Sequence, residues 1–128
     1  MSAYQVPLSG DPLLQAVTES LVALHERYYR APATAKSQML GEDLLACVLG
    51  GVFTDVEKTM IELQRGRVVQ ETRSAFQEAM QQKFIDEVER LSGREVLAFI
   101  SNQHIGPDLE VELFVFRSEN GFDEPVAQ

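Results

Sequence analysis

The sequence predicts an α+β domain whose elements follow the order α-β-β-α-α-β-β. Three observations predict it: apolar stripes at three- and four-residue spacing, short apolar or alternating runs, and Gly or Pro between them. Because the strands come in adjacent pairs, we expect a sandwich, with an antiparallel sheet of two hairpins and the helices packed on one face. The expected domain spans residues 11–117 of the 128-residue chain, with a flexible N-terminus at 1–10 and a flexible C-terminal tail at 118–128.

The first helix and the first hairpin have clear boundaries. Asp11 can accept hydrogen bonds from free backbone N–H groups, so the helix is expected to begin there and to end near Arg30, before a proline. Strands at 34–40 and 43–49 follow. The second strand is apolar on both faces, which predicts a central strand covered on both sides. The helix's expected inward stripe is Leu14, Val17, Leu21, Leu24 and Tyr28.

The middle of the chain predicts two more helices. Thr54 and Glu57 have the T-x-x-E spacing of a capping box, in which each side chain binds the other's backbone N–H, so a short helix is expected at 55–64. A longer helix is expected at 67–91, ended by Gly93. Its inward face consists of Val69, Phe76, Met80, Phe84, Val88 and Leu91.

Strands at 95–102 and 109–117 complete the chain as a hairpin with a somewhat long turn. In the last strand Glu110 and Glu112 share one face with Phe114 and Phe116. We interpret this as a half-covered face with the glutamates turned outward. Either a helix or a second copy of the chain could cover the aromatic end, and we expect a homodimer.

Arg73 is the most informative single residue. It has the helical spacing of the inward face, where a charge must be paired or must face a cavity. Glu57 and Glu62 on the preceding helix are its candidate partners. One interpretation is a structural ion pair, or a side chain whose aliphatic part is buried while its charged end reaches solvent. The other is a site for an anion such as carboxylate, phosphate or bicarbonate.

The turn of the second hairpin gathers Ser101, Asn102, His104 and Asp108. Such side chains ordinarily bind the turn backbone, and the alternative is a ligand or catalytic role. His104 would then be the group that titrates near neutral pH, whereas His25 is expected on the solvated surface of the first helix. No nucleophile elbow or oxyanion loop accompanies them, so we assign no catalytic residue.

Composition limits the partners. The formal net charge is −9, which disfavours nucleic acid and anionic lipid surfaces. We expect no direct membrane insertion, because no run of about 18 apolar residues occurs, and no secretory signal is visible. The single cysteine and two distant histidines lack metal-ligand spacing, so no metal or cofactor is expected. These features predict a cytoplasmic domain.

Longer patterns resemble the MpsC family, small bacterial proteins of unknown function named after a sodium-translocating, membrane-potential-generating system. The resemblance covers about residues 13–116. It implies a soluble component linked to cation- or inorganic-carbon-coupled membrane energetics, and it carries over no catalytic residue. The matching stretches are LGGVFTDVEKTMIE, GRVVQETRSAFQEAM, FIDEVERLSGREVLAFISNQHIGPDLEVELFVF and, more loosely, YYRAPATAK. Candidate ligand or interface residues in these blocks are Thr54, Glu57, Arg73, Ser101, His104 and Asp108.

Three functions are therefore weighed. The first is a non-enzymatic accessory or regulatory protein, held at the membrane peripherally by a transporter or another protein partner. The second is an anion-binding domain or small enzyme that uses Arg73 and His104, which requires both in one pocket. The third is an RNA-binding α+β domain, against which the acidic charge argues.

Overall fold

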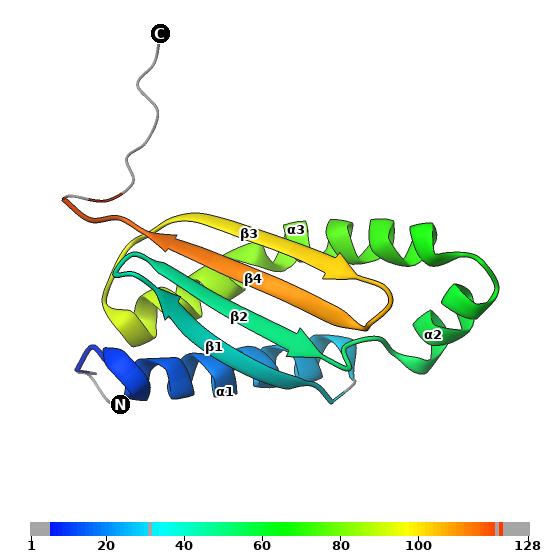
Figure 1. Ribbon diagram of the computed structural model, residues 1–128, viewed down its shortest axis with the longest axis horizontal. Helices are drawn as coiled ribbons and strands as arrows, with labels where there is room; N and C mark the ends of the chain where they lie inside the picture. Colours follow the sequence, from blue (N-terminus) through cyan, green and yellow to red (C-terminus); the bar gives the residue numbers. More distant parts are fainter. Residues whose placement is uncertain (1–5, 31, 120, 122–128) are drawn as a thin grey trace, which may run out of the picture.

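The computed structural model describes residues 6–30, 32–119 and 121. Helix α1 (Gly10–Tyr29) is followed by strands β1 and β2, helices α2 and α3, and strands β3 and β4 (Figure 1). The bounds of these six elements are β1 Thr34–Leu40, β2 Leu44–Gly50, α2 Asp55–Glu62, α3 Gly66–Ser92, β3 Val96–His104 and β4 Leu109–Phe116.

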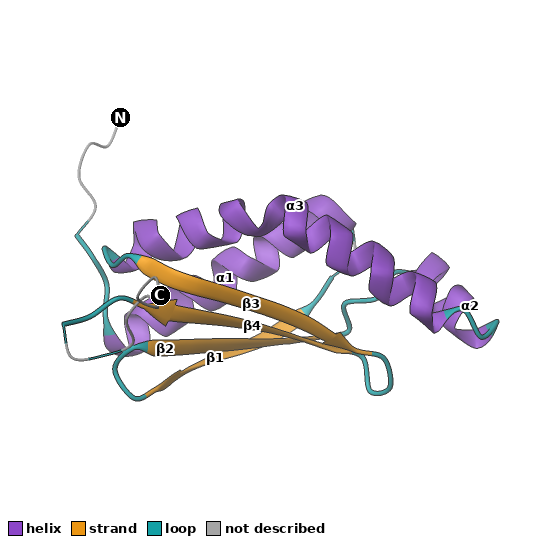
Figure 2. Cartoon of the chain, turned by 90° about the horizontal axis from the view of Figure 1, so that it is seen from above, coloured by secondary structure: helices purple, strands orange, loops and turns teal. Residues whose placement is uncertain are grey.

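The strands form one antiparallel sheet in the order β1-β2-β4-β3. Strands β1 and β2 form one hairpin, and β3 and β4 form the other. The pairing of β2 with β4 joins the two hairpins into one sheet. Helices α1 and α3 cover one face of this sheet and leave the other face open, while α2 lies beyond its end (Figure 2). The predicted α+β class, element order and one-sided helix packing are confirmed.

Helix α1 begins one residue earlier than expected. Ser9 occupies the N-cap position without a side-chain hydrogen bond, and Asp11 lies in the first turn, where its charge favours the helix dipole. The buried stripe is also rotated slightly from the expected one. Leu14 and Leu24 are only half-buried. The buried residues of α1 are Leu13, Val17, Leu21 and His25.

Strand β2 lies centrally in the sheet, but the expectation that both its faces are covered is wrong. Leu45, Cys47 and Leu49 are buried against the helices. Val48 points to the other side and is 38% exposed. Both faces of β2 are therefore apolar, but the helices cover only one of them.

Strand β4 shows the clearest correction. The face that carries Glu110, Glu112, Phe114 and Phe116 is fully buried beneath the helices. It is neither half-covered nor turned outward. Burying two phenylalanines contributes on the order of 2–3 kcal/mol each, which favours placing this face inward. The glutamates on the same face are buried with them.

The remaining boundaries differ by a few residues. Helix α2 ends earlier than expected, and α3 ends at Ser92, followed by the C-cap residue Gly93 with a φ of 68°. Strand β3 extends to His104, so the turn before β4 is shorter than predicted. Much of the two expected flexible ends lies outside the described residues. Of the described part, the Leu8 N–H donates to the Leu91 carbonyl at 2.9 Å, and the Ser118 hydroxyl donates to Asp43 at 2.8 Å.

Candidate functional site

Arg73 lies on the sheet-facing side of α3, and its side chain is fully buried. Its Nε donates to Glu57 Oε2 at 2.7 Å, and its Nη2 donates to Glu57 Oε1 at 2.6 Å. Nη2 also donates to the Val52 carbonyl at 2.5 Å. The expectation that Arg73 points inward is confirmed, and its partner on α2 is Glu57. This paired geometry uses the planar fork of a guanidinium.

The other side of the guanidinium meets α1 and β4. Nη1 lies 3.3 Å from His25 Nε2 and donates to Glu110 Oε1 at the same distance. The rings of Tyr29 and Phe53 lie 4.2 and 5.0 Å from the guanidinium carbon. All five guanidinium N–H groups therefore have partners within the described protein. The geometry matches a structural ion pair, because an added anion would have to displace one of these groups.

Glu57 takes part both in the ion pair with Arg73 and in the capping box of α2. Its carboxylate accepts from the Thr54 N–H at 2.8 Å, and the Thr54 hydroxyl accepts from the Glu57 N–H at 3.2 Å. The capping box predicted for α2 is confirmed. Burial alone would raise the pKa of Glu57, but the hydrogen bonds from Arg73 and Thr54 outweigh burial and lower it.

Asp108 joins this network at the tip of the β3–β4 hairpin. Its two carboxylate oxygens accept from the Val52 N–H at 2.9 Å and from the Phe53 N–H at 3.1 Å. The segment before α2 is thus held by Asp108 through its N–H groups and by Arg73 through the Val52 carbonyl. Thr54, Glu57, Arg73 and Asp108 come together as one connected scaffold.

His104 is not part of this group. It is exposed near the end of β3, and its Nδ1 lies 2.9 Å from the Pro107 carbonyl. His104 alternates with buried Gln103 along the strand, so it faces the open side of the sheet. Arg73 lies on the helix-covered side. The structure therefore does not form the shared pocket that an Arg73–His104 enzyme requires.

A second buried polar group lies beside Arg73, and sequence reasoning missed most of it. His25 is 1% exposed, which corrects its expected place on the solvated surface. Glu112 is fully buried, and Ser101 lies directly opposite it on β3. Burial, and next the neighbouring Glu110 carboxyl, raise the pKa of Glu112 well above its ordinary value, while the Ser101 hydroxyl opposes this shift.

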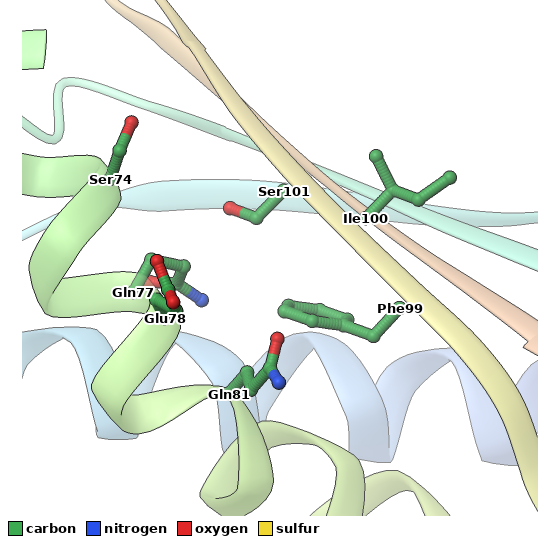
Figure 3. Close-up of a pocket in the computed structure, with 7 residues that line it drawn as sticks. All are labelled: Ser74, Gln77, Glu78, Gln81, Phe99, Ile100 and Ser101. Atoms are coloured by element: carbon green, nitrogen blue, oxygen red, sulfur yellow. The ribbon is translucent and has the colours of Figure 1, made fainter. Parts of the chain in front are cut away.

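Gln77, one turn after Arg73 on α3, completes this group and is 4% exposed. Among the described residues, both carboxyl oxygens of Glu112, both polar atoms of the Gln77 amide and the Ser101 hydroxyl have no hydrogen-bond partner. Gln77 and Ser101 also line a cavity of about 290 Å³ between α3 and β3. In Figure 3 the Gln77 amide extends from α3, and the Ser101 hydroxyl from β3, into the space between these two elements.

The open face of the sheet is the other candidate site. Cross-strand register places its residues in rows with an apolar centre and a more polar end near the β3–β4 turn. The chain has 20 Asp and Glu residues, yet none lies on this face of the described strands. On this face the only basic residues that the described strands carry are Lys36 and His104. The rows are Leu40-Leu44-Val115-Ala98, Gln38-Ala46-Leu113-Ile100, Lys36-Val48-Val111-Asn102 and Thr34-Gly50-Leu109-His104.

Comparison with known families agrees with the sequence patterns. The family model described as "Na+-translocating membrane potential-generating system (MpsC)" matches residues 13–118. The chain belongs to the MpsC family. Neither a curated protein nor a solved structure matches this MpsC-family chain significantly. Within its described part, no helix is long and apolar enough to cross a membrane, and no group of three or more His, Cys, Asp or Glu could hold a metal ion.

Proposed function

We propose that this MpsC-family chain is a non-enzymatic, cytoplasmic accessory or regulatory component of a cation- or inorganic-carbon-coupled membrane system. It acts as a homodimer that forms through the open face of the sheet, and it docks peripherally on an integral membrane partner. The family description supports the link to membrane energetics. The open face is the single observation that carries the proposal of a protein that acts by assembly and not by catalysis.

Charge supports a second copy as the occupant of the open face. Two chains that each carry a net charge of −9 repel one another, and this repulsion is smallest when their contact surfaces carry no carboxylates. The open face meets that condition, and its centre is apolar, with Val48 38% and Ile100 56% exposed. A two-fold axis through the sheet would bring the apolar rows of both copies together and bury them.

Charge also favours a protein rather than lipid as the membrane contact. Anionic lipid headgroups repel an acidic chain, whereas the cytoplasmic loops of membrane proteins carry an excess of Lys and Arg. An RNA partner is less well supported. In the described strands the open face carries no Phe, Tyr or Trp ring on which a base could stack.

The function is tested in cells that naturally encode the chain, with its gene deleted and then restored. A voltage-sensitive dye measures the membrane potential in the presence and absence of Na⁺. We expect deletion to lower the Na⁺-dependent potential and the wild-type chain to restore it. A deletion strain that keeps its full Na⁺-dependent potential would overturn the proposed function.

A matched pair of variants then tests the open face in the same strain. Val48→Glu introduces a carboxylate into the centre of the open face. Val56→Glu makes the same change on α2, where Val56 is 73% exposed. We expect Val56→Glu to restore the potential and Val48→Glu to fail, at equal cellular protein levels. Equal restoration by both variants would remove the open face from the function.

A further inference from the structure

We propose that the cavity between α3 and β3 binds a small organic ammonium ion, which hydrogen-bonds to Gln77 and Ser101 and whose charge is balanced by Glu112 behind them. This site lies on the helix-covered side of the sheet. It does not depend on the open face, so its test and the tests of the proposed function can fail separately.

Unpartnered polar atoms are the first observation. Gln77 is 4% exposed, and neither its amide oxygen nor its amide nitrogen has a partner among the described residues. The Ser101 hydroxyl likewise has no partner at ordinary hydrogen-bond distance, although it lies close enough to Glu112 to lower the pKa of that carboxyl. Leaving one such buried group without a partner costs about 1–3 kcal/mol. Figure 3 places the Gln77 amide on α3 and the Ser101 hydroxyl on β3, both directed into the cavity that they line.

The charge around the cavity selects the ligand. The residues that line it include one carboxylate, Glu78, and no Lys or Arg. Behind its wall lies Glu112, fully buried and directly across from Ser101. In this part of the interior the guanidinium of Arg73 is paired with Glu57 and Glu110, and the buried carboxyl of Glu112 lies beside Glu110, with no cation among the groups that shift its pKa. A ligand with one positive charge would allow Glu112 to release its proton.

Size and lining favour an organic ion over a bare metal ion. A cavity of about 290 Å³ is far larger than one water or alkali ion, and close to the lower limit of small-molecule sites. The Phe99 ring forms part of its wall and would contact an alkyl group or the cation itself. An ammonium group supplies several N–H donors, which match Gln77 Oε1 and Ser101 Oγ.

Binding is expected to depend on pH through Glu112. The groups that act on this carboxyl come from every neighbouring element. Tyr29 acts on it from α1, whereas Arg73 on α3 contacts His25 and the adjacent Glu110. Cys47 lies opposite on β2, and Glu110 is two residues away on β4. Burial raises the pKa of Glu112, and binding of a cation is coupled to loss of its proton, so affinity should rise by up to tenfold per pH unit while Glu112 titrates.

The experiment titrates the full chain with ethylammonium chloride at pH 6, 7 and 8, with NaCl at equal ionic strength as the reference. The readouts are the melting temperature and the NMR signals of the Gln77 side-chain amide. We expect ethylammonium to shift both, with an affinity that rises with pH. A matched response to NaCl, or no response of the Gln77 amide, would overturn the site.

Variants separate the roles of the residues. Glu112→Gln preserves the shape of the buried side chain but cannot ionise, so it is expected to fold and to weaken ethylammonium binding at least tenfold. Ser101→Ala is expected to weaken it severalfold. Glu71→Gln is the control, because it removes one charge at an exposed position of α3. Equal affinity in the wild type and Glu112→Gln would overturn the assigned role of Glu112.

Discussion

The Nε and Nη2 groups of Arg73 donate to the two carboxylate oxygens of Glu57, at 2.7 and 2.6 Å. This pair ties the first turn of α2 to the buried face of α3 about two turns after α3 begins. Because the same guanidinium also reaches the Val52 carbonyl and Glu110, it joins three parts of the fold at one buried point.

Removing Arg73 should strongly destabilise the domain. Arg73→Met keeps much of the side-chain volume but leaves Glu57 and Glu110 without their cation. We expect a loss of about 3–5 kcal/mol in the free energy of unfolding, measured by urea denaturation. Arg67→Met is the control, because Arg67 is exposed on the same helix, and it should change stability by less than about 0.5 kcal/mol. Equal effects of both variants would contradict the network.

Acid should weaken the same network through Glu57. Its folded-state pKa is lowered, so its contribution is present above its ordinary pKa of 4.5 and is lost as the pH falls through the lower, folded-state pKa. Glu57→Gln is therefore expected to destabilise the domain at pH 7 and to have a smaller effect at pH 3. Urea denaturation of both proteins across this range measures the difference, and a constant difference would contradict the assignment.

Glu112 should show the opposite dependence. Its folded-state pKa is raised by burial, so the unfolded chain loses its proton near pH 4.5 while the folded chain retains it. Stability therefore falls as the pH rises above that value, by up to about 1.4 kcal/mol per pH unit. Glu112→Gln removes this dependence and should be more stable than the wild type at pH 8, but not at pH 4. Glu71→Gln is the control, and its stability relative to the wild type should be the same at pH 4 and at pH 8.

The core scaffold is largely readable from the sequence. Helical spacing places Arg73 on the inward face, and the T-x-x-E pattern places Glu57 at the start of the preceding helix. Two local patterns thus bring the members of the ion pair close together. Period-two and helical patterns likewise predict the element order, because each depends only on neighbouring residues.

The buried glutamates could not be predicted in the same way. In β4 both alternating faces contain large apolar residues, so the period-two pattern does not decide which face turns inward. Phe114 and Phe116 favour the face that also carries Glu110 and Glu112. The burial of Glu110 is tolerated because Arg73, on a helix distant in the sequence, donates a hydrogen bond to it. Such a tertiary contact cannot be read from the local pattern of β4. The burial of His25 could have been predicted, because His25 follows Leu21 by four residues and so continues the buried stripe of the helix.

The open face gives rise to the last prediction, which concerns assembly. In a two-fold dimer a single substitution occurs twice at the interface, so Val48→Glu would place two carboxylates in its apolar centre. Val56→Glu adds the same charge on α2 and should leave assembly unchanged. The folded structure should persist in both variants, because each side chain faces away from the core.

Sedimentation equilibrium at micromolar concentration tests the open face most directly. We predict that the wild type and Val56→Glu sediment at twice the 14.3 kDa chain mass, and that Val48→Glu sediments as a single chain. A wild-type chain that sediments as a monomer at this concentration, or a Val48→Glu variant that remains a dimer, would contradict the claim that the open face joins two copies.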